Sequence, residues 1–556
     1  MADARPIQAP ARRPPRRAPL ALSLPALAVA AACLLPMAAV ALAAALGDLD
    51  TLRQLARTVL ARYAGATLAL AVLVGAGAAA LGTATAWLTA ACAFPGRRWL
   101  EAALVVPLAF PAYVLAYAYT HVLDFPGPVQ TALRDLTGWG PRDYWFPEIR
   151  SLGGAALVLT LTLYPYVYLL ARASFQLAGK GAFQVARSLG HGPWGAWTRA
   201  AVPMARPAIV AGTLLVAMEV IADYGTVAFF GVQTLATGIY TSWFSLADRG
   251  AAAQLALGLL ALALLLAGLE RLSRAGARYA GRLRREDARI PLSGPAAAGA
   301  MALCLAPVLL GAALPALALG AMALGSEQDV LSRRYAGFVG DTVMLAAIAA
   351  VVTVAAAVAV GTYRRLAPGW PSAAAMAVAR LGYAVPGGVI AVGLLVPFAA
   401  FDNAVDAFME ARFGLDTGLL VTGSIWLLVG AYAVRFLAAA LGAYEGGLAT
   451  VTRNVDAAAR VLGAGGWATV RRVHLPVVRP AVLTAATIVF VDVAKELPAT
   501  LILRPFDVDT LAVQAHRLAA DERLQGAAVP SLMLAALGLV PVVLLMRRMR
   551  RADGPA

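Results

Sequence analysis

Runs of about twenty consecutive apolar residues recur along the whole chain, and they limit its possible folds more than any other feature. An α-helix of that length crosses the roughly 30 Å hydrocarbon layer of a membrane. Apolar residues make up 61% of the 556 positions and charged residues 14%, which is far too apolar for a set of soluble domains. The alternating strands of about ten residues that an outer-membrane barrel requires are not seen. We therefore predict an all-α polytopic membrane protein.

We predict about twelve transmembrane helices, six in each half of the chain. In the first half they lie near 18–46, 61–92, 100–122, 152–172, 203–230 and 252–269. In the second half they lie near 296–324, 341–361, 380–401, 417–441, 476–503 and 527–546. The first run is too long and too apolar for a removable signal peptide, so we expect it to remain as an anchor.

The basic residues predict how these spans are oriented. If the amino terminus faces the cytoplasm, 31 of the 46 Lys and Arg residues fall in inner segments and twelve in outer segments. Both termini are therefore predicted to be cytoplasmic. The net charge of +16 then reflects topology and contact with anionic lipid of the bilayer, and we expect no nucleic-acid partner.

Neither the cysteines nor the histidines form a metal-binding pattern. The three cysteines lie inside apolar runs and are interpreted as buried side chains, and the four histidines are scattered. We expect no cofactor bound by this chain and assign no metal site.

The chain contains an internal repeat. With a shift of 273 residues, segment 184–208 aligns with 457–481, and 11 of the 25 positions are identical. The matches include Gly, Trp, Arg and Pro, which a general excess of alanine cannot explain. A second match, Pro111 with Pro386, has an offset of 275. The predicted domains are a basic tail (1–17), a first six-helix repeat (18–270), an Arg-rich linker (271–295), a second six-helix repeat (296–546) and a basic tail (547–556). Six spans per half return the chain to the same side, so the repeats are parallel.

The repeated segment lies between the fourth and fifth spans of each half, on the predicted cytoplasmic side. We interpret it as a short helix, a glycine break, a second amphipathic helix and a proline that opens the next span. Gly190 and Gly463 permit the backbone reversal, and Pro203 and Pro476 suit a first helical turn. Such a loop offers a docking surface to another protein, although an ordinary basic loop copied by duplication remains the alternative.

These loops resemble the "EAA" loops of permease subunits in bacterial ABC importers, in which proline follows glycine by thirteen residues. Segments 111–119, 218–231, 237–244 and 491–512 further resemble the ferric-iron branch of that family, in which two permease halves are fused. The glutamate that gives the loop its name falls on Gln184 in the first half and on Ala457 in the second.

The resemblance implies a permease in the bacterial inner membrane with two kinds of partner. A periplasmic or surface-tethered solute-binding protein would deliver the substrate, and two ATP-binding cassette subunits carrying ATP and Mg would grip the loops. The residues expected to contact those subunits are Arg187, Gly190, Pro203, Arg206, Arg460, Gly463, Pro476 and Arg479. The chain itself lacks the phosphate-binding motif G-x-x-x-x-G-K-[ST], so ATP hydrolysis is expected on a separate polypeptide.

Acidic residues occur inside the fifth span of each half. Glu219 and Asp223 in the first half match Asp492 and Glu496 in the second at the same offset of 273. Residues four apart share one helix face. Carboxylates at mid-membrane cost about 2.5–3.5 kcal/mol each, so they should face a polar cavity or an ion-pair partner. We interpret them as part of a pathway for a cation, with structural ion pairs to Lys495 or Arg504 as the alternative.

Two residues just beyond these acidic pairs predict a weakened helix in the fifth spans. Gly225 aligns with Pro498, and both disfavour continuous helix. The predicted pathway comprises Glu219, Asp223, Tyr224, Asp492, Lys495, Glu496 and Pro498. The tyrosines at 113, 117 and 119 could add phenolic oxygens, although packing is their commoner role.

The predicted function is therefore a permease, not an enzyme, that moves iron(III) or an iron chelate. Within the family, thiamine or a phosphonate is the alternative substrate. Outside the family, a proton-coupled secondary transporter would also suit six plus six spans, but it gives no reason for twin docking loops.

Overall fold

The computed structural model describes residues 20–275 and 289–552, which are helical nearly throughout. Within these ranges, eleven helices are long and apolar enough to cross a membrane, or twelve if the pair Arg97–Ala109 and Ala112–Thr137, bent by 94°, counts as one span. The all-α polytopic fold is thus confirmed. The predicted amino-terminal tail lies outside the described residues, as does the central part of the linker.

The described part of the first half contains eighteen numbered elements before the linker. They are α1 (Leu20–Leu46), α2 (Leu49–Thr58), α3 (Leu60–Ala91), β1 (Cys92–Ala93), α4 (Arg97–Ala103), α5 (Ala112–Leu123), α6 (Pro128–Thr137), α7 (Leu152–Ser174), α8 (Lys180–Ser188), α9 (Pro193–Ala196), α10 (Val202–Ala222), α11 (Gly225–Phe229), α12 (Leu235–Tyr240) and α13 (Arg249–Ala275), with the 3-10 turn η1 (Val106–Ala109) between α4 and α5. π-helical turns follow α7, α9 and α12, as η2 (Phe175–Gly179), η3 (Trp197–Ala201) and η4 (Thr241–Ser245).

The second half repeats this order with small differences. Its elements are β2 (Ile290–Pro291), α14 (Gly294–Val308), η5 (Leu309–Ala313), α15 (Leu314–Leu324), α16 (Arg333–Leu366), α17 (Trp370–Ala379), η6 (Gly382–Ala384), α18 (Gly387–Phe413), α19 (Ile425–Leu448), α20 (Arg453–Val461), α21 (Gly466–Thr469), η7 (Val470–His474), α22 (Leu475–Ala494), α23 (Pro498–Leu503), α24 (Leu511–Ala520) and α25 (Leu524–Ala552). The strands β1 and β2 pair in parallel and attach the end of the linker to the end of α3.

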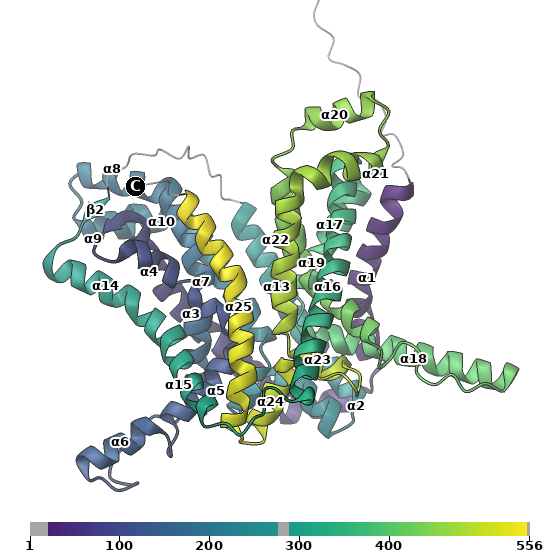
Figure 1. Cartoon of the computed structure of the whole chain (residues 1–556), viewed down its shortest axis with the longest axis horizontal. Coiled ribbons are helices and arrows are strands. Elements are labelled where there is room, and N and C mark those ends of the chain that lie inside the picture. The colour runs from purple at the N-terminus through teal and green to yellow at the C-terminus, as the bar shows by residue number, and fades with distance from the viewer. Residues whose placement is uncertain (1–19, 276–288, 553–556) are drawn as a thin grey trace, which may run out of the picture.

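The third span of each half departs from the predicted straight helix. The span predicted at 100–122 is broken, because Pro107 and Pro111 remove two backbone donors and the chain passes through η1 before α5 begins. The span predicted at 380–401 begins at Gly387 and continues to Phe413. Figure 1 shows α6 and the end of α18 projecting from opposite sides of the bundle. Both projecting helices end at a glycine with positive φ, which closes the last helical turn.

The packing units do not coincide with the two sequence halves. One hydrophobic core combines α3, α5 and α7 with α14, α15, α24 and α25 of the second half. The other combines α16, α18, α19 and α22 with α1, α12 and α13 of the first half. The first helix of each half therefore lies against the other half. The backbones of α1 and α18 approach so closely that a Cβ at Gly393 would overlap the Pro36 carbonyl.

Candidate functional site

The two predicted docking loops have the expected reversal at glycine. Gly190 and Gly463 lie between α8 and α9 and between α20 and α21, with φ of +88° and +78°. A left-handed backbone strains any residue with a Cβ, so glycine suits these positions. Figure 1 shows both loops at the same end of the molecule, each at the head of its own bundle.

The second part of each loop differs from the expected separate amphipathic helix. It is a single turn, α9 or α21, that continues through a π-helical turn into α10 or α22 without a break. Pro203 and Pro476 do lie in the first turn of α10 and α22, but each sits inside a continuous helical path and does not open a new one. The π-helical turns η3 and η7 lie at matching positions in the two loops, 273 residues apart.

The predicted arginines lie on the exposed side of these loops. Arg187 donates to the His191 carbonyl at 2.8 Å across its glycine turn, whereas Arg460 donates to the Asp456 carbonyl at 3.2 Å within α20. Arg206 and Arg479 are exposed one turn further along α10 and α22. The same loops carry exposed apolar side chains, chiefly Leu189, Trp194, Val461 and Leu462. This combination of apolar and basic side chains can bind a partner surface.

A buried ion-pair cluster anchors the second loop, and sequence reasoning missed it. The carboxylate of Asp456, on α20, lies 2.8 Å from Arg365 Nε and 2.7 Å from His474 Nε2. Burial raises the pKa of Asp456, but hydrogen bonds from His474 and Arg365 more than offset this, and the pKa lies below its ordinary value. Arg365 also donates to the carbonyls of Leu448 and Val451. Asp456 lies next to Ala457, the position of the glutamate that names the EAA loop. Its carboxylate is therefore already paired with side chains of this chain.

The first loop is anchored by different chemistry at the equivalent place. Phe183, 273 residues before Asp456, packs against Trp87 with ring centroids 5.0 Å apart. The two loops thus have similar backbones, but an aromatic contact holds the first loop and buried ion pairs hold the second. The sequence already shows that the residue types at these two equivalent positions differ. It does not show their partners, because Trp87 and Arg365 lie far away along the chain.

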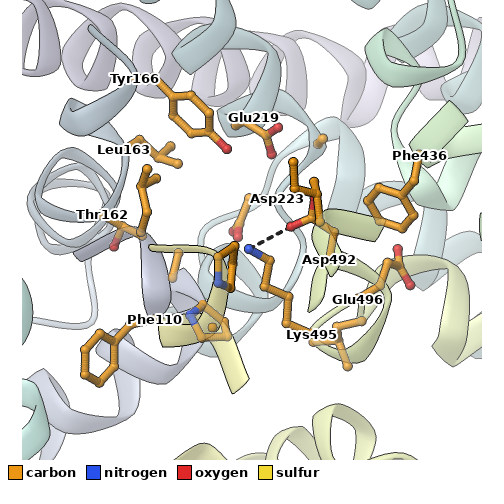
Figure 2. A pocket seen from close by; sticks show the side chains of 18 of the residues that line it. Phe110, Thr162, Leu163, Tyr166, Glu219, Asp223, Phe436, Asp492, Lys495 and Glu496 are labelled. Atoms are coloured by element: carbon orange, nitrogen blue, oxygen red, sulfur yellow. Dashed lines mark ion pairs between the residues drawn. The ribbon is translucent and has the colours of Figure 1, made fainter. Parts of the chain in front are cut away.

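A cavity of about 390 Å³ lies where the two halves meet. All seven residues of the predicted pathway line it: Glu219, Asp223, Tyr224, Asp492, Lys495, Glu496 and Pro498. The remaining walls come mainly from η1, α5, α7, α22 and α25. Figure 2 shows the carboxylates of both halves around one open space, with Tyr166 beside Glu219.

The fifth spans are broken beside the cavity, as the sequence predicted. Helix α10 ends at Ala222 and α22 at Ala494, and short helices α11 and α23 follow. Asp223 accepts bonds from the backbone N–H groups of Thr226 and Val227 at 3.1 Å, and Glu496 does the same for Ala499 and Thr500 at 3.0 and 3.1 Å. These two carboxylates therefore cap the short helices that follow each break.

The other two carboxylates have side-chain partners. Glu219 accepts a 2.7 Å hydrogen bond from Tyr383 Oη, which comes from the opposite half. Asp492 forms an ion pair of 3.0 Å with Lys495. Arg435 lines the cavity, and its Nη1 lies 3.7 Å from Glu496 Oε1. The lysine therefore pairs with the aspartate and not with the adjacent Glu496, and Arg504 instead pairs with Asp509.

Hydrogen bonds across the halves reach both sides of the second helix break beside the cavity. Tyr113 Oη donates to the Lys495 carbonyl at 3.4 Å, and Tyr240 Oη donates to the Pro498 carbonyl. The Lys495 carbonyl is free for this bond because the Ala499 N–H is bound by Glu496. The ring of Tyr240 stacks on Tyr224 with centroids 3.7 Å apart.

Two neighbouring tyrosines do not contribute oxygens to the cavity. Tyr119 donates to the Leu310 carbonyl at 2.9 Å, and Tyr117 Oη lies 3.4 Å from His516 Nδ1. Of the three tyrosines in the third span, Tyr113 is the one that lines the cavity.

A repeated threonine contact supports the short helices beyond the breaks. Thr67 accepts a 2.9 Å bond from the Leu235 N–H at the start of α12, and Thr342 accepts one from Leu511 at the start of α24. The offset of 275 between these threonines equals that of Pro111 and Pro386, so the repeat alignment could have indicated the pair.

Comparison with known proteins agrees with this arrangement. The profile of the family "Binding-protein-dependent transport system inner membrane component" matches residues 78–279 and again 353–552. The Fe(3+)-transport system permease protein FbpB 2 of Haemophilus influenzae is 26% identical over 96% of this chain and 99% of its own length. The probable ABC transporter permease protein y4fN of Sinorhizobium fredii is 27% identical over 74% of this chain and 73% of its own.

A shorter relative matches only part of the chain. The molybdenum transport system permease protein ModB of Escherichia coli is 28% identical over 32% of this chain and 78% of its own. The two profile matches together cover most of the polypeptide, with one copy in each half. The chain is therefore a multi-pass membrane permease that belongs to the family of binding-protein-dependent transport system inner membrane components, with two copies of the family domain fused in one polypeptide.

Proposed function

We propose that this chain is the fused permease subunit of an ATP-driven importer that moves iron(III), free or chelated, into a bacterial cytoplasm. A solute-binding protein outside the inner membrane delivers the substrate. Two separate ATP-binding subunits, carrying ATP and Mg, dock on the two loops. Both chain termini face the cytoplasm in this arrangement.

The observation that carries the proposal is the cavity with repeat-equivalent carboxylates from both halves. Glu219 and Asp492 come from matching positions on α10 and α22 and both line the same space. Carboxylates inside a membrane are costly, and Tyr383 and Lys495 satisfy Glu219 and Asp492 through side chains that a passing cation can displace. The helix breaks next to them provide a place where backbone can rearrange without exposing polar groups to lipid.

The docking loops support the energy-coupling part of the proposal. Each loop is continuous with the very helix that carries the cavity carboxylates, through the π-helical turn and then α10 or α22. A push on a loop therefore moves Glu219 or Asp492 directly along a rigid element. Exposed side chains such as Trp194 and Leu462 give an ATP-binding subunit an apolar surface to grip.

An oxyanion or a phosphonate is the second candidate substrate. Two cations, Lys495 and Arg435, line the cavity, and relatives named for molybdenum and for 2-aminoethylphosphonate transport match at 28% identity. Both cations already contact carboxylates, at 3.0 and 3.7 Å, while four carboxylates line the same space. The excess of negative charge favours a cationic substrate.

The test is uptake into proteoliposomes that contain this chain with its ATP-binding subunits. Radioactive iron(III) supplied with a ferric solute-binding protein should accumulate only when ATP is available. Removing the ATP-binding subunits should stop uptake. Accumulation driven by a pH gradient alone would contradict the proposal, and uptake of molybdate or 2-aminoethylphosphonate without iron uptake would favour the second candidate.

A further inference from the structure

The identity of the cation beside Asp492 is unusual for this chain. Of its 46 basic residues, 44 are arginine and two are lysine, Lys180 and Lys495. Cationic positions are thus filled by arginine almost everywhere, on both predicted sides of the membrane. One of the two exceptions lies in the cavity, where a charged side chain matters most.

The structure shows which group this lysine contacts at the cavity. Its ammonium lies 3.0 Å from Asp492 Oδ1, and both side chains are about three-tenths exposed, so the ion pair borders the open space. The first half has no counterpart, because Ala222 is the residue 273 positions earlier. The matching carboxylate there, Glu219, is held by the neutral hydroxyl of Tyr383.

The four cavity carboxylates therefore differ in their availability. Asp223 and Glu496 each accept three hydrogen bonds from the start of a short helix, and removing those bonds would uncap it. Asp492 can exchange its partner more easily, because a mobile side chain and not the backbone occupies it. The hydrogen bonds that cap α23 come from Glu496 and not from the Lys495 side chain, so displacing that side chain does not break them.

A lysine can leave Asp492 where an arginine would hold it. An ammonium is a compact charge on a flexible stem, whereas a guanidinium binds a carboxylate with two parallel hydrogen bonds in a fixed plane. The stem of Lys495 also begins at the helix break, with its carbonyl bound by Tyr113 from the other half. Movement of the halves at this contact therefore moves the base of the lysine.

We propose that Lys495 is a tethered cation, which neutralises Asp492 while the cavity is empty and competes with the transported metal cation for that carboxylate. Binding of a multivalent cation displaces the ammonium, and return of the ammonium to Asp492 assists release. This role rests on the proposed function, because it presumes a cationic substrate. It makes Lys495 a determinant of affinity, not only a structural ion pair.

The test measures cation binding by the purified full-length chain in phosphatidylcholine nanodiscs. The probe is Tb³⁺, a hard trivalent cation whose luminescence is sensitised by nearby tyrosines such as Tyr166 and Tyr383. Lys495→Met removes the charge and keeps a side chain of similar length. Because Tb³⁺ then no longer competes with a charged hydrogen bond to Asp492, its binding should tighten about tenfold or more. Adding Asp492→Asn to that variant should abolish the gain.

Arg504→Met is the matched control, because it breaks an ion pair of the same half, with Asp509, outside the cavity lining. It should leave Tb³⁺ affinity unchanged. If Lys495→Met lowers thermal stability without tightening Tb³⁺ binding, the ion pair is only structural and the proposal is wrong. Failure of every variant to bind Tb³⁺ would also overturn it, whereas the importer assignment is tested separately by ATP-dependent uptake.

Discussion

Replacing Asp456 with alanine should detach the second docking loop from the rest of the permease. The substitution leaves Arg365 and His474 without their shared carboxylate at the base of α20. Because the first loop rests on Phe183 and Trp87, it should keep its position. The variant thus separates the contributions of the two loops.

The expected magnitude follows from the burial of the pair. Removing one partner of a buried ion pair costs about 3–5 kcal/mol. The side chains of Arg365 and Asp456 are 15% and 9% exposed, and Arg365 keeps its bonds to three carbonyls, so the lower end applies. A loss of about 3 kcal/mol shifts the balance between docked and undocked α20 by roughly a hundredfold.

Hydrogen exchange measured by mass spectrometry over residues 453–461 should report this change. Protection of α20 should fall by about two orders of magnitude in Asp456→Ala while α8 keeps its exchange rate. ATP hydrolysis by the assembled importer should continue but drive less uptake per ATP. Asn454→Ala, an exposed change on the same helix, is the control and should behave like the wild type.

The pH dependence gives the same reasoning a second test. Because the folded pKa of Asp456 lies below its ordinary value, its stabilisation is complete above the unfolded pKa and is lost as pH falls through the folded pKa. Protection of α20 should therefore be constant from pH 8 to about pH 5 and fall at more acidic pH. Unchanged protection and unchanged uptake in Asp456→Ala would show that this cluster does not hold the loop.

Three further outcomes are expected. Neutralising Glu219 and Asp492 together should abolish uptake while the complex still assembles on a sizing column; normal uptake by the double variant would refute the pathway assignment. Tyr240→Phe removes a hydroxyl bond to the helix break beside the cavity and should raise ATP hydrolysis in the absence of binding protein, whereas Tyr119→Phe, which also removes a bond across the halves but one away from that break, should not. Gly463→Ala places a Cβ at φ +78° and should cost about 1–2 kcal/mol locally, seen as faster exchange in that loop than in the wild type.

Local chemistry made several features predictable from the sequence. The apolar runs predicted the spans, because length and hydropathy are properties of each segment alone. Gly190 and Gly463 predicted the reversals, and Gly225 and Pro498 predicted the broken fifth helices, because a missing Cβ or a missing N–H acts on its own backbone. The repeat placed the acidic residues of both halves at equivalent positions, and the structure brings them around one cavity.

Tertiary structure alone decided which helix faces which and which charge pairs with which. A membrane helix is apolar on its lipid face as well as on its packed face, so periodicity does not show that α1 and α14 exchange places between the halves. The partners of Asp456 and Glu219 were likewise hidden, because Arg365 and Tyr383 lie far away in sequence. The sequence determined where the chain crosses the membrane and where it breaks, since those depend on neighbours along the chain; ion pairs and helix exchange depend on neighbours in space.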